Sequence, residues 1–107
     1  MEYLPELYTT FQTRFPEVQE AYHELSRRIY QTGPLDQRTG HLIKLGVAIG
    51  MNSEGAVRSH ARRALHEGAT PEEILQAVLL TFTTCGFPFM SAALKWVEEV
   101  LEKEGRA

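Results

Sequence analysis

His60 is the residue of this sequence best placed to carry out chemistry, because it lies on the apolar face of a predicted helix. Small apolar residues at spacings of one, three and four share that face: Ala56, Val57, Ala61 and Ala64. In a folded protein such a face turns inward, away from water. A histidine held there is either a packed residue with hydrogen-bonded ring nitrogens or a group that transfers protons, and its position alone leaves both open.

Metal and thiol chemistry find little support in the sequence. His66 follows His60 by six positions, which places the two imidazoles about 240° apart around a helix, so they cannot share a metal ion. Cys85 is the one cysteine, which excludes an intrachain disulfide and a multi-cysteine zinc site, and its apolar surroundings favour a buried, inert thiol. Because phosphate-loop, nucleophile-elbow and dinucleotide motifs are also missing, we expect no metal and no cofactor.

The charge pattern narrows the possible partners. The formal net charge is −3, which argues against a general nucleic-acid binder. Arg58, Arg62 and Arg63 could anchor a carboxylate, but Arg58 and Arg62 share a face turned away from His60 and favour a solvated charged stripe. The apolar runs are too short to span a membrane, and the N-terminus lacks a secretory signal. We therefore expect a cytoplasmic protein that binds neither nucleic acid nor membrane.

Length and periodicity predict the fold class. The chain has 107 residues, of which 43% are hydrophobic and 23% charged, as in ordinary globular proteins. Apolar residues recur at helical spacing, and the alternation typical of strands is absent. We therefore expect one all-α domain over residues 1–107, a helical bundle of about six helices. A core of this size has little surplus stability, so an oligomer would help it.

Start and stop signals place the helices along the chain. The expected helices span residues 4–11, 16–33, 36–50, 53–68, 70–81 and 89–104. Asp36, Ser53 and Thr70 are expected N-caps, and Thr70 should form a capping box with Glu73.

The third expected helix has two unusual features. Its apolar residues, Ile43 and Val47 among them, surround it broadly, which predicts burial on more than one side. It also contains Gly40, Gly46 and Gly50, each of which lowers helix stability by about 1 kcal/mol relative to alanine. We therefore expect close approach of a neighbouring backbone.

An ordered series of motifs resembles one known family. The alanine-rich segment S-E-G-A-V-R-S-H-A begins at Ser53, G-A-T-P-E-E-I covers residues 68–74, and C-G-F-P covers residues 85–88. Over roughly residues 35 to 100 this series is similar to the carboxymuconolactone decarboxylase and alkylhydroperoxidase D family. The resemblance implies that family's helical bundle, assembled as a trimer or hexamer.

The chain departs from the redox members of that family at their cysteines. Those members carry two cysteines, seven and four positions before the histidine, where this sequence has Ser53 and Ala56. Thiol peroxidase chemistry needs both thiols, so it is disfavoured. The position of the family's glutamate, twelve residues before the first cysteine, is His41. His41 is either a half-buried helix residue or a partner that faces His60.

Decarboxylase members also lack the cysteines and keep the histidine, but they tend to carry glutamate where this chain has Ala56. The nearby Glu54 points away from that position and is better explained as a favourable charge in the first helical turn. The resemblance implies a cofactor-free decarboxylase or lactone-processing enzyme that uses His60 for proton transfer. His41 would be its partner, and Ser53 and Ala56 would contact a small carboxylate or lactone. The alternative is a non-enzymatic oligomeric or ligand-binding protein of the same fold.

Overall fold

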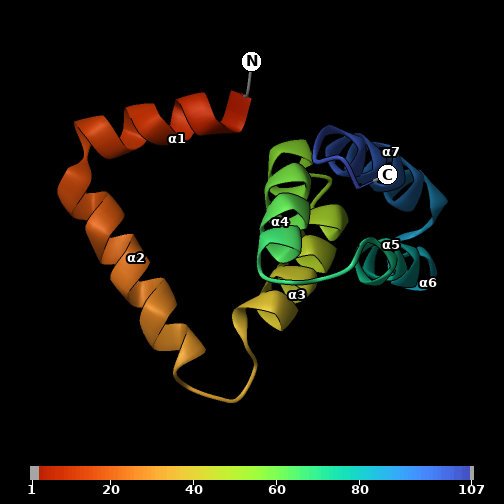
Figure 1. Ribbon diagram of the computed structural model, residues 1–107, viewed down its shortest axis with the longest axis horizontal. Helices are drawn as coiled ribbons and strands as arrows, with labels where there is room; N and C mark the ends of the chain where they lie inside the picture. Colours follow the sequence, from red (N-terminus) through yellow and green to blue (C-terminus); the bar gives the residue numbers. More distant parts are fainter. Residues whose placement is uncertain (1–2, 107) are drawn as a thin grey trace. The chain divides into compact units, whose positions relative to one another are not determined.

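A computed structural model describes residues 3–106, and over this range every regular element is an α-helix. In chain order these are α1 (Tyr3–Arg14), α2 (Pro16–Tyr30), α3 (Gln37–Gly50), α4 (Glu54–His66), α5 (Pro71–Leu80), α6 (Phe82–Cys85) and α7 (Phe87–Lys103) (Figure 1). The predicted all-α fold is confirmed. The backbone forms two compact units, Met1–Leu35 and Asp36–Ala107, and the expectation of a single domain over the whole chain stays a prediction.

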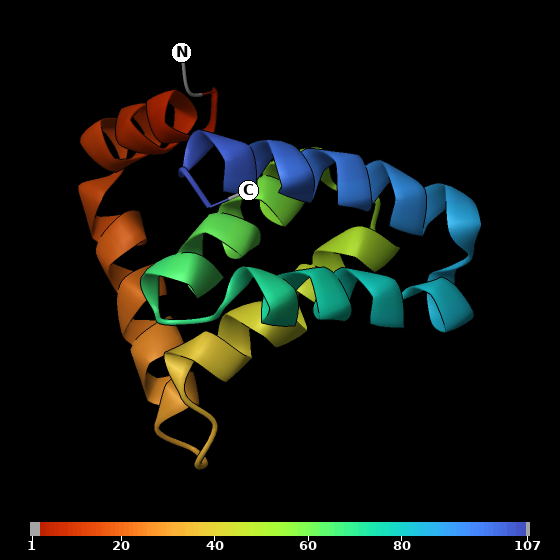
Figure 2. The ribbon, with the colours of Figure 1, turned by 45° about the vertical axis from the view of Figure 1, so that its right-hand side comes forward.

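The second unit contains the hydrophobic core. Helix α3 packs against α4, α5 and α7, and α4 and α5 also pack against α7 (Figure 2). The largest fully buried side chains come from all four of these helices: Leu45, Ile49, Val57, Ile74, Val78 and Val97. The predicted inward face of α4 is confirmed, since Val57, Ala61 and Ala64 are fully buried.

Local capping explains where α3 and α5 begin. The carboxylate of Asp36 accepts a hydrogen bond from the amide of Thr39 at 2.9 Å. At α5, the amide of Glu73 donates to the Thr70 hydroxyl at 3.1 Å, and the Glu73 carboxylate accepts from the Thr70 amide at 2.9 Å. The predicted caps at Asp36 and Thr70 are therefore confirmed, and Pro71 follows Thr70 at the first helical position.

Ser53 was predicted to cap α4 through its hydroxyl, and this prediction is wrong. Ser53 is the N-cap residue, but its side chain makes no capping hydrogen bond. Its backbone is used instead: the Ser53 amide donates to the carbonyl of Ala48 at 3.0 Å, which closes the turn between α3 and α4. Asn52 completes that turn with a φ of 53°, a left-handed conformation that asparagine tolerates.

Ion pairs connect helices that are distant in sequence. Arg38 of α3 donates to Glu73 of α5 at 2.7 Å. Arg58 of α4 donates to Glu99 of α7 at 2.6 Å and to Glu54, one turn earlier, at 3.0 Å. Arg58 is therefore not part of a freely solvated stripe, because two carboxylates hold its guanidinium between α4 and α7.

Two expectations for α3 are not met within this chain. Ile43 is 50% and Val47 57% exposed, so within the described part of the second unit α3 is buried on one side only. A side chain added at Gly46 would meet no other atom within 4 Å, and at Gly50 it would meet the Cys85 sulfur at 3.6 Å, an ordinary contact. No backbone approaches either glycine closely, and the prediction of such an approach is wrong at both positions.

The C-terminal boundaries also differ from the prediction. Residues 82–85 form the single turn α6, and the last helix begins at Phe87 rather than Phe89, with Pro88 in its first turn. Proline is tolerated there because its missing amide hydrogen would have no helical partner. Gly86 makes the bend between α6 and α7 with a φ of 88°, a conformation that favours glycine.

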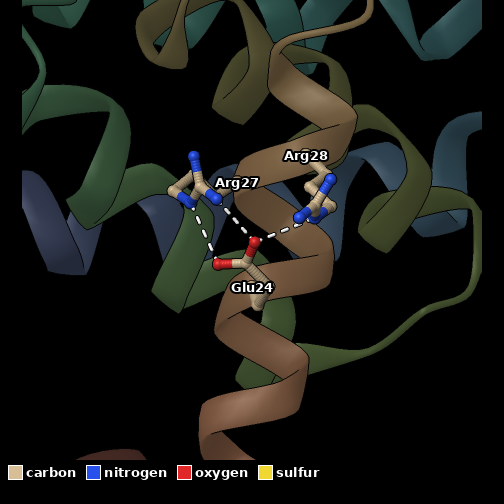
Figure 3. A network of polar contacts seen from close by, with 3 residues as sticks. All are labelled: Glu24, Arg27 and Arg28. Atoms are coloured by element: carbon tan, nitrogen blue, oxygen red, sulfur yellow. Dashed lines mark hydrogen bonds and ion pairs between the residues drawn. The ribbon is translucent and has the colours of Figure 1, made fainter.

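The first unit consists of α1 and α2. Proline in the first turn opens α2, as predicted. Within α2, Glu24 accepts hydrogen bonds from Arg27 at 3.0 Å and from Arg28 at 2.8 Å (Figure 3). The first helix was expected over residues 4–11, and the side chain of Leu4 in this range lies outside the described part of the chain. Among the described residues, no helix is long and apolar enough to cross a membrane.

Candidate functional site

The candidate site is a pair of histidines, one from α3 and one from α4. Nδ1 of His41 lies 3.1 Å from Nδ1 of His60, and the two ring centroids are 5.3 Å apart with the ring planes inclined by 32°. The two residues meet because α3 and α4 form a hairpin that turns at Met51 and Asn52, almost midway between them in the sequence. The tight turn closed by Ser53 therefore sets the register that brings these two rings together.

Both rings have lost much of their contact with water. His41 is buried, with 6% of its surface exposed, and His60 is partly buried beside the fully buried Val57 and Ala61. Burial lowers the pKa of His60 from its ordinary 6.5 to about 4, and the neighbouring His41, Arg63 and Lys44 add to this effect. Burial also lowers the pKa of His41, helped by Lys44 and Arg63 and opposed by Glu67.

Two neutral imidazoles in this contact must divide the donor and acceptor roles. One ring donates its Nδ1–H, and the other accepts through an unprotonated Nδ1. The donating ring then carries a lone pair on its Nε2, and the accepting ring carries a proton on its Nε2. The pair thus offers one base and one acid. Loss of the Nε2 proton at one ring, movement of the shared proton across the 3.1 Å contact, and uptake of a proton at the other Nε2 together exchange their roles.

The other two predicted site residues lie on the same helix as His60. Ala56 precedes His60 by one turn, is partly buried and packs against the core, while Ser53 stands partly exposed at the start of α4. The structure thus brings His41 and His60 into contact, with Ala56 one turn away on the same helix face. Contact of Ser53 and Ala56 with a substrate stays a prediction.

Two cations outside the predicted set of site residues influence the pair: Lys44, and Arg63, which was considered from the sequence only as a possible carboxylate anchor. Lys44 and Arg63 both lower the pKa of each histidine through their positive charge. Each follows a histidine by three positions, Lys44 after His41 and Arg63 after His60. Side chains three positions apart lie on the same face of a helix, so this spacing is the feature of the sequence that could have assigned both cations to the site.

Metal binding has no support in the described part of the chain. Between residues 3 and 106, no group of three or more histidine, cysteine, aspartate or glutamate side chains is placed to hold a metal ion. Cys85 is partly exposed rather than fully buried. His66, the other histidine of α4, pairs with Glu104 at 3.1 Å and takes no part in the pair.

Comparison with known proteins identifies relatives of this chain. The model of the carboxymuconolactone decarboxylase family matches residues 16–99. An uncharacterized protein of Methanocaldococcus jannaschii is 30% identical over 90 residues, which are 84% of this chain and 81% of that protein. The 4-carboxymuconolactone decarboxylase of Acinetobacter baylyi is 29% identical over 73 residues, which are 68% of this chain and 54% of that enzyme.

A solved structure has the same fold. The crystal structure of a carboxymuconolactone decarboxylase family protein from Legionella pneumophila superposes with a TM-score of 0.78 at 23% sequence identity. The superposition covers 92% of this chain and 88% of that protein. At this level of identity the similarity concerns the fold alone.

Proposed function

Because the chain belongs to the carboxymuconolactone decarboxylase family, we propose that it is a cofactor-free decarboxylase or lactone-processing enzyme that acts on a small carboxylated lactone. His60 is the proton-transfer group and His41 its partner. The observation that carries this proposal is the 3.1 Å contact between the two Nδ1 atoms. It couples two neutral imidazoles, so that one Nε2 donates a proton while the other accepts one.

A decarboxylation of this kind needs a proton donor and an electron sink, and the histidine pair supplies the proton donor. In a decarboxylation, the bond between the carboxylate carbon and the lactone ring breaks, and its electron pair moves into the conjugated lactone carbonyl as an enolate. The carbon dioxide leaves, and the enolate carbon takes a proton from the Nε2–H of one imidazole. The shared proton then moves between the Nδ1 atoms to that ring, and a proton from water enters at the other Nε2, which leaves hydroxide to combine with the carbon dioxide as bicarbonate. The two rings have then exchanged roles, and the same transfers in reverse, with water giving and taking the protons, restore the original donor. The substrate itself supplies the electron sink.

The electrostatics of the site suit an anionic substrate. Lys44 and Arg63 are close enough to both rings to lower their pKa values, and the same positive field would attract a carboxylate. A pKa of about 4 for His60 keeps that ring neutral at physiological pH. The ring is therefore uncharged at the start and at the end of each reaction cycle.

Thiol peroxidase activity remains the disfavoured alternative. The positions that carry the two cysteines in redox relatives are Ser53 and Ala56, and neither side chain can form a sulfenic acid or a disulfide. Cys85 stands at the far end of the short turn α6, between α5 and α7, and has no second cysteine to resolve it. A non-enzymatic ligand-binding role is the remaining candidate, and the experiment below separates it from catalysis.

The proposal is tested by offering the protein a panel of small carboxylated lactones and measuring carbon dioxide release and loss of ultraviolet absorbance. We expect turnover of at least one compound, and we expect His60→Asn to reduce kcat by about 100-fold or more, the usual effect of removing a general acid. His66→Asn is the matched control, because it removes an imidazole of the same helix that pairs with Glu104 instead. Peroxide with a thiol donor should be consumed no faster than in a blank.

Two results would count against catalysis. Compounds that raise the thermal midpoint without releasing carbon dioxide would identify a binding protein. Equal turnover in the wild type and His60→Asn would show that the reaction does not pass through this ring.

A further inference from the structure

Two cations flank the histidine pair, one on each side of it along the α3–α4 hairpin. Lys44 follows His41 in α3, and Arg63 follows His60 in α4, each by three positions. Because the chain reverses direction between the two helices, Lys44 lies on the side of the pair nearer the turn, and Arg63 lies on the side away from it. At a rise of about 1.5 Å per residue, the backbone of each cation is about 4.5 Å along the helix from its histidine. A carboxylate beside the pair therefore has two alternative partners.

The side of the pair that contains Lys44 has little negative charge to compete for its ammonium group. Residues 42–59, which form the hairpin between the two histidines, contain one acidic residue, Glu54. Its carboxylate accepts a hydrogen bond from Arg58 at 3.0 Å. Ala56, which lies at about the level of Lys44 in the hairpin, ends in a methyl group. It offers neither a charge nor a hydrogen-bonding group that could take the place of a ligand.

The side that contains Arg63 carries a negative charge of its own. Glu67 follows Arg63 by four positions, the spacing that places two side chains on one helix face. Its charge reaches the pair, because Glu67 opposes the burial and the two cations that lower the pKa of His41. A carboxylate that approached Arg63 would also approach Glu67, and the repulsion between like charges would weaken its binding.

We propose that the ammonium group of Lys44 binds the carboxylate of the substrate and makes the site select anionic over neutral molecules. The identity of the ligand as a substrate rests on the proposed function. Lys44 is partly buried, so water and salt screen its charge less than that of a fully exposed lysine. An ammonium group has three donors and can bind a carboxylate while it keeps a contact within the protein. Less than one helical turn separates Lys44 from His41, so a small ring attached to the bound carboxylate reaches the imidazoles.

The experiment measures the binding of 2-furoate, a stable five-membered ring with a carboxylate, to the full chain. Nuclear magnetic resonance of the histidine ring protons reports the binding, and we expect the signals of His41 and His60 to shift. The neutral ester methyl 2-furoate should bind at least about 10-fold more weakly, because it cannot form a charge-assisted hydrogen bond with Lys44. Lys44→Gln should raise the Kd of 2-furoate by about 10-fold or more and leave the Kd of the ester unchanged.

Two variants serve as controls. Lys95→Gln removes the same charge from an exposed lysine of α7 and should leave the Kd of 2-furoate unchanged. Arg63→Gln removes the cation on the other side of the pair and should raise that Kd less than Lys44→Gln does.

Five results would overturn the proposal. They are a wild type that does not bind 2-furoate, equal affinity of the wild type for the acid and the ester, a wild-type Kd in Lys44→Gln, and a larger effect of Arg63→Gln. The fifth is an equal loss of acid and ester binding in Lys44→Gln, because a lost charge weakens the binding of the acid alone.

These outcomes differ from those that test the proposed function, because binding of 2-furoate needs no turnover. A Kd that depends on Lys44, in a protein that releases no carbon dioxide from any lactone, would retain the carboxylate site and remove the catalysis. Turnover of a carboxylated lactone with the same KM in the wild type and Lys44→Gln would retain the catalysis and overturn the carboxylate site.

Discussion

Protonation of His60 should destabilise the folded protein, and this can be measured as a pH-dependent difference between the wild type and His60→Asn. The pKa of His60 is about 4 in the folded chain, against the ordinary value of 6.5 that the unfolded chain retains. Between these two values the unfolded chain binds more protons, so stability increases with pH through this window. The loss of folding stability caused by keeping His60 neutral is absent above pH 6.5 and grows as the pH falls toward 4.

The magnitude follows from the two pKa values. At about pH 5, a shift from 6.5 to about 4 corresponds to a loss of about 2 kcal/mol relative to neutral pH. This is an upper value, because the ring is only partly buried and the solvent screens part of the effect. We therefore expect the wild type to lose about 1 kcal/mol more than His60→Asn between pH 7.5 and pH 5.

The assay is urea unfolding of both proteins at the two pH values and one fixed protein concentration, followed by circular dichroism. Asparagine keeps a hydrogen-bonding group near the position of Nδ1 but does not titrate, so changes at groups that the two proteins share cancel in the comparison. His41 stays in both proteins, and its own lowered pKa leaves a smaller pH dependence in the variant. If the two proteins lose the same free energy between the two pH values, His60 is not held neutral by its surroundings.

Two further predictions concern the core and the capping of α5. Ile74→Ala should lower the free energy of unfolding by about 3 kcal/mol, because Ile74 is fully buried. Leu79→Ala on the same helix, at a site 52% exposed, should lower it by less than about 1 kcal/mol. Urea unfolding measures both values, and equal losses would contradict the assigned core. Thr70→Ala should lower the free energy of unfolding by about 1 kcal/mol, because it removes the capping box. Thr70→Ser should keep most of the wild-type stability, and thermal unfolding measures both variants. An unchanged midpoint in Thr70→Ala would mean that the cap contributes nothing.

Features that depend on neighbouring residues could be predicted from the sequence. The capping box at Thr70 and the cap at Asp36 involve residues three apart, and both form as expected. The inward face of α4 follows from helical spacing in the same way. Ser53 is the exception, because the turn between α3 and α4 uses its backbone to close on Ala48 and leaves its hydroxyl outside the cap.

Features that depend on the packing of distant segments could not be predicted. Arg58 reaches Glu99, 41 residues later in the chain, because α4 and α7 pack side by side. No local pattern in the sequence indicates which carboxylate meets this arginine. Likewise, the sequence shows that Ile43 and Val47 are apolar but not what covers them. The described residues of the second unit leave 50% and 57% of their surfaces exposed.

The histidine pair could be predicted in part, and its chemistry depends on the part that could not. The pairing of His41 with His60 came from a resemblance, whereas the distance of 3.1 Å and the burial of both rings come from the packing of α3 on α4. A glutamate at position 41 would hold a negative charge beside His60 and favour its protonated form. His41 does the reverse: burial is the main cause that lowers the pKa of His60, and the charges of His41, Arg63 and Lys44 add to it. The substitution therefore favours a site in which protons move between neutral rings over one that stores a positive charge.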